Sequence, residues 1–192
     1  QAPVLPSSKV LAKQLLAGLP FKMTNAQKRV SKEIADDLKQ NKPMLRLVQG
    51  DVGAGKTLVA GVAACHALEA DWQVALMAPT EILAEQHYLN FKRWFEPLGL
   101  NVAWLSGKQK GKARSAAEAQ IATGAAQLVI GTHALFQDNV KFAKLGLVII
   151  DEQHRFGVDQ RLALRNKGLN GMTPHQLVMT ATPIPRTLAM SA

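Results

Sequence analysis

QGDVGAGKTLVAG, residues 49–61, is the stretch that decides the fold of this 192-residue chain. Three of its first seven residues are glycine, and Lys56 and Thr57 follow directly before an apolar run. Residues 50–57 match the pattern G-x-x-x-x-G-K-[ST] in full, with a strand-like run before them and a helical pattern after them. The pattern and its context predict a loop that wraps a phosphate chain between a β-strand and an α-helix.

Each residue type in this loop suits a triphosphate. Glycine lets backbone N–H groups approach the phosphates without a Cβ in the way, and the helix N-terminus adds the positive end of its dipole. Lys56 can reach the β and γ phosphates and act in catalysis, and the Thr57 hydroxyl can bind Mg²⁺. An ordinary glycine-rich turn is the alternative, and the surrounding strand and helix argue against it. The predicted nucleotide-binding residues of the loop are Gly50, Asp51, Val52, Gly53, Ala54, Gly55, Lys56 and Thr57.

Working outward, six short apolar runs rich in Val, Ile and Leu alternate with helical or loop patterns. This alternation is typical of βα units, and continuous apolarity implies that both faces of the strands are buried. The sequence therefore predicts an α/β fold with a mainly parallel sheet and helices on both faces. The runs are residues 44–50, 73–79, 101–107, 127–132, 145–152 and 176–182.

Helical patterns occupy much of the remaining chain. Ala26, Val30, Ile34 and Leu38 recur every four residues and predict a helix that begins after residues 23–25. The other predicted helices are residues 57–69, 80–95, 112–123 and 158–166.

Composition indicates the cellular compartment of the protein and the charge of its partners. Charged or amide side chains interrupt every apolar run before membrane-span length, so we expect a water-soluble protein with no membrane partner. Cys65 is the only cysteine, which rules out an internal disulfide, favours the cytoplasm and suggests a small core residue. The formal net charge of +9 favours an anionic partner, although a solvated, lysine-rich surface is an equally ordinary explanation. Residues 1–8 do not resemble a signal peptide and look like the cut end of a longer protein.

An acidic pair follows the apolar run at residues 147–150. Hydrolysis of a bound triphosphate needs a metal anchor and a group that deprotonates water, both at a strand end beside the phosphate loop. We expect Asp151 to hold Mg²⁺ and Glu152 to be the general base. A helix N-cap is the alternative for one of the two carboxylates.

With the phosphate loop and this acidic pair in place, the chain resembles the first RecA-like motor domain of superfamily two DNA helicases and translocases. The resemblance implies a RecA-like P-loop NTPase fold, a three-layer sandwich, and runs from about Leu19 to Ala192. It divides the chain into a linker or helix segment (1–18), ATP-binding domain 1 (19–182) and the start of a linker to a second RecA-like domain (183–192). The matching segments are GDVGAGKT (50–57), DEQH (151–154), LPFKMTNAQ (19–27), APTEILAEQH (78–87), GTHAL (131–135) and TATPIPRT (180–187).

Within that superfamily, DEQHRFGV, GTHALFQ, SGKQKGKAR and TATPIPRTLAM are most similar to the RecG family of bacterial ATP-dependent DNA helicases. The transcription-repair coupling factors are the nearest alternative. Those factors usually carry glutamate at the position of Gln153, so Gln153 favours the RecG family. The resemblance implies ATP and Mg²⁺ as cofactors and branched DNA, such as stalled replication forks and Holliday junctions, as partner. It also implies a second RecA-like domain and a wedge domain in a monomeric, nucleoid-associated bacterial protein of the cytoplasm. A nucleic-acid-binding module with a non-hydrolytic nucleotide site is a further alternative.

The resemblance also assigns further residues. Phe21 and Gln27 would contact the adenine, but Thr24 and Gln27 also fit a capping box, so Gln27 could serve only to cap a helix. The residues expected to couple nucleotide state to DNA are Gln153, His154, Thr180 and Thr182; for His154 a purely hydrogen-bonded role is equally open. The expected DNA-binding residues are Pro79, Thr80, Glu81, Gly131, Thr132 and His133, with Lys108, Lys110, Lys112 and Arg114 either on phosphates or simply solvated.

Overall fold

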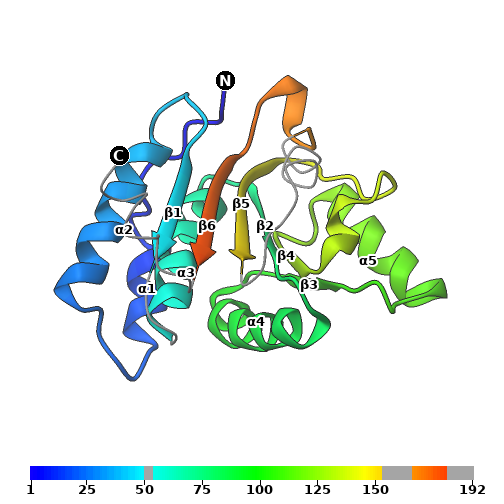
Figure 1. The fold of residues 1–192 in the computed structure, drawn as a ribbon, viewed down its shortest axis with the longest axis horizontal. Helices are drawn as coiled ribbons and strands as arrows, with labels where there is room; N and C mark the ends of the chain where they lie inside the picture. The colour runs from blue at the N-terminus through cyan, green and yellow to red at the C-terminus, as the bar shows by residue number, and fades with distance from the viewer. Residues whose placement is uncertain (50–53, 153–165, 181–192) are drawn as a thin grey trace, which may run out of the picture.

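The computed structural model describes residues 1–49, 54–152 and 166–180 of the chain. Six strands form one sheet in the order β1-β6-β5-β2-β4-β3, and every strand pair within it is parallel (Figure 1). All six predicted strands are confirmed. They are β1 (Leu45–Gln49), β2 (Gln73–Met77), β3 (Val102–Leu105), β4 (Leu128–Gly131), β5 (Leu145–Glu152) and β6 (His175–Thr180).

The helices of the described residues are α1 (Leu11–Ala17), α2 (Asn25–Leu38), α3 (Ala54–Glu69), α4 (Glu81–Phe95) and α5 (Gly111–Thr123), with short 3₁₀ turns η1 (Glu96–Leu98), η2 (His133–Phe136) and η3 (Leu169–Gly171). Four of them, α2 to α5, match predicted helices, and α1 lies in the segment 1–18, for which both a linker and a helix had been left open. The helix predicted at 158–166 lies almost wholly outside the described residues. Across the described ranges, no helix combines the length and apolar character needed to cross a membrane.

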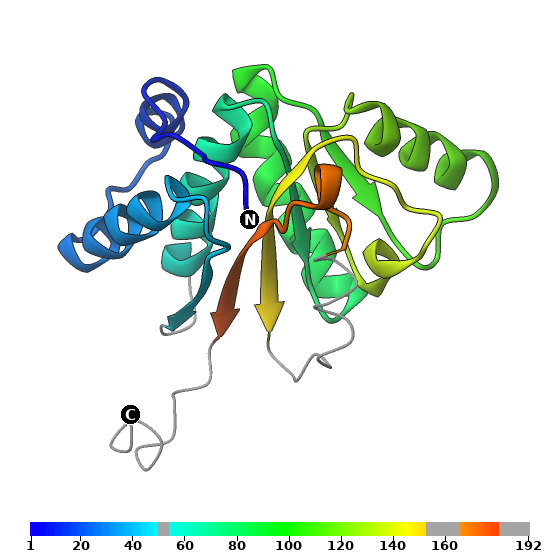
Figure 2. The same ribbon diagram turned by 90° about the horizontal axis from the view of Figure 1, so that it is seen from above.

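Two hydrophobic cores lie on opposite faces of the sheet, because successive side chains of a strand point to opposite sides. On β5, Leu147 and Ile149 join the core beneath α3 and α4, whereas Val148 and Ile150 join the core beneath α5. In Figures 1 and 2, α5 lies at the far end of the sheet from α1 and α2. The chain therefore has the predicted layers of helix, sheet and helix. Cys65 of α3 is fully buried, as expected, and burial raises the pKa of its thiol.

The first residues of the chain pack into the larger core. Leu5, Leu11 and Leu15 are buried there. The backbone N–H groups of Ala2 and Leu5 donate to the carbonyls of Asn41 (2.7 Å) and Leu38 (2.8 Å). These contacts fasten the N-terminal segment along the end of α2.

Glu69, at the end of α3, holds the start of α1. Its carboxylate accepts hydrogen bonds from the backbone N–H groups of Lys9 (2.7 Å), Val10 (3.0 Å) and Leu11 (2.8 Å) and from the Ser8 hydroxyl (2.9 Å). Donors that have no partner within α1 are thus satisfied by a side chain distant in sequence. The hydrogen bond from Leu11, together with those from Lys9 and Val10, lowers the pKa of Glu69 to about 2.

Candidate nucleotide and DNA site

The strand register brings the ends of β1, β6 and β5 level with one another. Gln49, the residue before the phosphate-loop motif, pairs with Thr180, and Thr180 pairs with Glu152 on its other side. Figure 2 shows the three arrowheads at the same edge of the sheet. Since neighbouring strands lie about 4.8 Å apart, Gln49 and Glu152 are separated by roughly 10 Å at the backbone. This edge is where open parallel sheets bind ligands.

The start of α3 supplies the other half of this edge. The helix begins at Ala54, so Gly55, Lys56 and Thr57 lie in its first turn, where backbone N–H groups have no partner within the helix. Lys56 and Thr57 are both half-buried. The first turn of a 16-residue helix, with a lysine and a hydroxyl on it, suits an anion. Residues 50–53 of the predicted loop lie outside the described residues.

Gln27 reaches this first turn from α2. The predicted capping box is confirmed: the Thr24 hydroxyl accepts from the Gln27 N–H (3.2 Å), and the Gln27 side-chain oxygen accepts from the Thr24 N–H (2.9 Å). The amide nitrogen of Gln27 lies so close to Gly55 that a Cβ at position 55 would collide with it. The cap of α2 therefore uses the amide oxygen of Gln27, while its amide nitrogen lies at the start of α3. Contact between Gln27 and an adenine stays a prediction.

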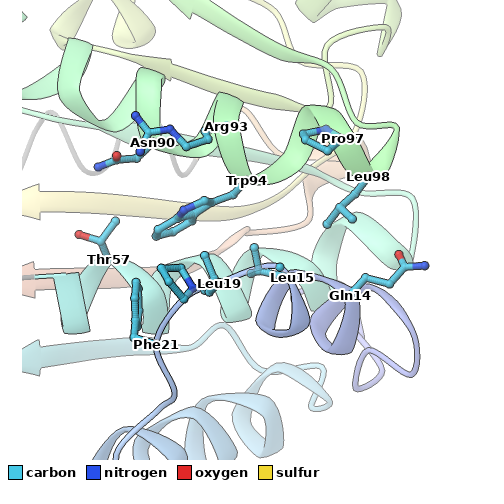
Figure 3. A pocket seen from close by; sticks show the side chains of 12 residues that line it. Gln14, Leu15, Leu19, Phe21, Thr57, Asn90, Arg93, Trp94, Pro97 and Leu98 are labelled. Atoms are coloured by element: carbon cyan, nitrogen blue, oxygen red, sulfur yellow. The ribbon is translucent and has the colours of Figure 1, made fainter.

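A cavity of about 600 Å³ opens beside this region, between α1, α3 and α4 (Figure 3). Thr57 and Phe21 lie at one end of it, and Gln14 and Leu98 lie at the other. The cavity thus joins two residues predicted for nucleotide binding. Its lining residues are Gln14, Leu15, Gly18, Leu19, Pro20, Phe21, Thr57, Asn90, Arg93, Trp94, Pro97 and Leu98.

Asp151 lies at the carboxyl end of β5 and is only 6% exposed. One of its oxygens, Oδ2, lies 2.6 Å from Nε2 of His87 on α4. His87 ends the matching segment APTEILAEQH (78–87), but no role was predicted for it, although a histidine among the apolar positions of a helix face was a usable signal. Glu152 ends the strand, and Gln153 and His154 lie outside the described residues.

The donor set fits Mg²⁺. A threonine hydroxyl and an aspartate carboxylate are the hard oxygen ligands that this ion prefers, and Mg²⁺ is usually held by one or two protein oxygens together with substrate phosphates. Within residues 1–49, 54–152 and 166–180, no group of three or more His, Cys, Asp or Glu side chains could hold a metal by itself. A site of Thr57 and Asp151 therefore needs phosphate oxygens to complete it.

The predicted DNA-binding segments follow β2, β3 and β4 at the same edge. Thr80 caps α4, its hydroxyl accepting from the Leu83 N–H (3.2 Å). The Glu81 carboxylate accepts from the Ser106 hydroxyl (2.6 Å) and from the Gly107 N–H (3.2 Å). Hydrogen bonds of Glu81 thus tie the segment after β2 to the segment after β3.

Arg114, a predicted phosphate contact, is held by groups of the protein itself. Its guanidinium donates to the Ser106 carbonyl (3.0 Å), to the Gln137 side chain (2.5 Å) and to Glu118 (3.1 Å). It therefore links α5 to the segments after β3 and after η2. Among the predicted DNA-binding residues, those that are exposed are Lys108, Lys110, Lys112, Thr80 and His133.

Thr132 is buried, Thr180 is half-buried at the end of β6, and Thr182 lies outside the described residues. Gly131 ends β4 against β3, where a Cβ would collide with the Leu105 carbonyl. Glycine at this position is thus required by the close approach of two strands, whatever its part in DNA binding.

Residues 24–191 match the family described as DEAD/DEAH box helicase. The chain belongs to that family. The DEAD/DEAH box match begins at Thr24, the N-cap of α2, and includes the phosphate loop, the acidic pair and the segments after β2 and β4.

Similar proteins carry the name that the sequence motifs indicated. The chain is 65% identical to the ATP-dependent DNA helicase RecG of Haemophilus influenzae over 182 residues, which are 94% of this chain and 26% of that protein. It is 49% identical to RecG of Aquifex aeolicus over 191 residues, 100% of this chain and 24% of that protein. The resemblance to the RecG family is confirmed, and this DEAD/DEAH box chain spans about a quarter of the length of the curated relatives it matches.

A solved structure described as RecG bound to a three-way DNA junction has the same fold. It superposes with a TM-score of 0.85 at 46% identity, covering 98% of this chain and 25% of the other.

Proposed function

We propose that this chain is the ATP-binding motor domain of a DNA helicase or translocase that acts on branched DNA, such as stalled replication forks and Holliday junctions, in recombination and repair. The register that sets Gln49 level with Glu152 carries the proposal, because it joins the phosphate-loop motif to the acidic pair. Further support comes from the RecG relatives and from the RecG structure described with a three-way junction.

The residues of the edge divide the work of ATP hydrolysis. Lys56 and the N–H groups of residues 50–57 bind the phosphates, and Thr57 and Asp151 hold the metal ion. At these two residues the ion would supply positive charge against the phosphates. Glu152 takes a proton from the attacking water. Phe21 and the amide nitrogen of Gln27 contact the adenine beside the first turn of α3.

The segments after β2, β3 and β4 bind DNA on the same edge. The exposed residues Thr80 and His133 contact the phosphate backbone, and this contact reads no sequence. Pro79, Glu81, Gly131 and Thr132 complete the DNA-binding segments that carry them. Lys108, Lys110 and Lys112 add salt-dependent attraction to phosphates. Gln153, His154, Thr180 and Thr182 link this grip to the state of the nucleotide.

The proposed activity also needs parts outside this chain. A second RecA-like domain of the parent protein supplies arginine side chains to the transition state, and such groups are worth about 10³- to 10⁵-fold in rate in other phosphoryl-transfer enzymes. A wedge domain binds the branch point. The chain alone is therefore nearly inactive, and the parent acts as a monomer in the bacterial cytoplasm close to the nucleoid.

ATP hydrolysis tests the proposal, measured for the full-length protein and for this chain alone, each with and without forked DNA. We expect forked DNA to raise the rate of the full-length protein severalfold and to leave the isolated chain near zero. Lys56→Ala and Glu152→Gln should each abolish hydrolysis. Unchanged hydrolysis in either variant would remove the role given to that residue.

A nucleic-acid-binding module with a structural nucleotide site predicts a different result. The full-length protein would then bind nucleotide and DNA, yet forked DNA would raise no hydrolysis. The names of the relatives favour the motor over this alternative and over a transcription-repair coupling factor.

A further inference from the structure

The contact between His87 and Asp151 joins two elements that the proposed function treats separately. The two residues lie 64 positions apart in sequence, and their side chains are only 10% and 9% exposed. At 2.6 Å, Nε2 of His87 and Oδ2 of Asp151 are at the short end of the hydrogen-bond range for nitrogen and oxygen. The imidazole N–H donates to the carboxylate, since an ionised carboxylate only accepts.

α4 holds this imidazole in place. His87 lies on the buried face of the helix with Ala84, Phe91 and Phe95, and its ring centroid is 6.3 Å from that of Phe91. Thr80 caps the start of α4, and Glu81 binds the segment after β3. Figure 1 shows α4 crossing beneath the arrowhead of β5. His87 thus lies on a helix that is held in place by hydrogen bonds at its start and by packing along its buried face.

A buried carboxylate with one oxygen occupied by a fixed donor cannot rotate freely. Oδ2 of Asp151 is held by His87, so the orientation of the whole carboxylate, Oδ1 included, is set at the carboxyl end of β5. Partners of this kind orient the ligands of metal ions, and their removal typically weakens metal affinity about 10- to 100-fold.

The geometry points to His87 as a positioning residue that holds the carboxylate of Asp151 in the orientation that binds Mg²⁺. This inference rests on the proposed function, because it takes Asp151 as a metal ligand. His87 also lies less than two helical turns, roughly 9 Å, beyond Glu81 on the same helix, so α4 connects a predicted DNA-binding segment to the proposed metal site.

A purely structural role is the competing explanation, since a buried carboxylate needs a partner whatever it binds. His175 provides the matched control. It is a buried histidine at the opposite end of the sheet, hydrogen-bonded to the Met44 N–H and the Pro3 carbonyl, so its loss weakens the fold without touching Asp151. Gln at position 87 provides the conservative variant, because its amide nitrogen extends about as far as Nε2 of histidine and also donates.

The test is Mn²⁺ affinity in the presence of a non-hydrolysable ATP analogue, measured by electron paramagnetic resonance of free Mn²⁺ on the full-length protein at a temperature where each variant is folded. We expect His87→Ala to weaken Mn²⁺ binding about 10-fold. His87→Gln should recover most of the loss, and His175→Ala should keep the wild-type affinity while unfolding at a lower temperature.

Two results would overturn the inference alone. In one, folded His87→Ala binds Mn²⁺ as the wild type does while Asp151→Asn does not; in the other, His175→Ala weakens binding as much as His87→Ala. If the wild type itself binds no Mn²⁺ with the analogue, the proposed function fails together with the inference.

Discussion

Two buried histidines at opposite ends of the same sheet have different partners. His175, at the start of β6, is fully buried, and both of its ring nitrogens meet backbone groups: Nδ1 accepts from the Met44 N–H (3.0 Å), and Nε2 donates to the Pro3 carbonyl (2.7 Å). His87, near the carboxyl end of β5, meets the side chain of Asp151.

The difference in partners distinguishes a histidine that stabilises the fold from one that lies at the candidate site. Burial lowers the pKa of His175, and its two backbone partners complete a neutral imidazole that fastens the N-terminal segment to β1 and β6. At the other end of the strands, polar side chains bind one another at the edge where α3 and the acidic pair meet. One end of the sheet is covered by the N-terminal segment of the chain, and the other end carries the residues that we propose to bind the nucleotide.

Asp151→Asn should break the site and keep the fold. An amide cannot supply the negative charge that balances Mg²⁺, so ATP hydrolysis by the full-length protein with forked DNA should fall by about 100-fold or more. The amide can still accept from His87, so the melting temperature should stay within a few degrees of the wild type. Hydrolysis and thermal unfolding measured on one preparation check both parts. Retained hydrolysis would remove Asp151 from the metal site.

His175→Ala should have the opposite effect. It leaves a buried N–H and a buried carbonyl without their partner, which costs about 2–4 kcal/mol of unfolding free energy. Urea unfolding of the variant should show this loss, whereas the exposed histidine control His133→Ala should change the unfolding free energy by less than about 0.5 kcal/mol. Equal losses in the two variants would show that the amino end of the sheet is not specially fastened.

The sequence predicted the carboxyl end of the sheet, which carries the candidate site, better than the amino end, which the N-terminal segment covers. Apolar runs and the phosphate-loop motif predicted all six strands and four helices, because these features are local and periodic. The first 18 residues gave no such signal. Leu5, Leu11 and Leu15 are core residues through contacts with parts of the chain that are distant in sequence, and the start of α1 is bonded to Glu69, about 60 positions away.

Within the candidate site, the sequence supplied candidate residues, whose roles stay predictions, but not their partners in the structure. Thr57 and Asp151 followed from motifs, whereas His87 is defined by a contact that spans 64 positions. Arg114 shows the reverse case. A cationic run suggested contact with DNA phosphates, yet the structure gives its guanidinium three partners within the protein. Spacing along the chain cannot show which charges fold inward.

Replacing Lys108, Lys110 and Lys112 together by glutamine tests DNA binding at the carboxyl end of the sheet. Each lost phosphate contact should lower the salt dependence of DNA binding by about one unit of slope, and affinity at physiological salt should fall by roughly 10-fold. Fluorescence anisotropy with forked DNA at several salt concentrations measures both. The matched control replaces Lys13, Lys28 and Lys32, exposed lysines on α1 and α2. An equal effect in the control would show that Lys108, Lys110 and Lys112 act only through the net charge of the protein.

Glu69→Gln should have the smallest effect, confined to the amino end of the sheet. Because the pKa of Glu69 is lowered from 4.5 to about 2 in the folded chain, the unfolded chain binds more protons in this window. The wild-type advantage is therefore complete above pH 4.5 and lost as the pH falls toward 2. The carboxylate is exposed, so we expect less than about 1 kcal/mol at pH 7. Urea unfolding across pH checks this, with exposed Glu85→Gln as the unaffected control; a difference that persists at pH 2 would contradict it.

A crystal structure of the full-length protein with a non-hydrolysable ATP analogue and Mn²⁺ tests the central claim most directly. The anomalous signal of Mn²⁺ locates the metal without ambiguity. We predict the metal bonded to the Thr57 hydroxyl and to phosphate oxygens, with Asp151 binding it directly or through one water and His87 still hydrogen-bonded to Asp151. A metal and triphosphate bound elsewhere, with Asp151 outside their reach, would contradict the account.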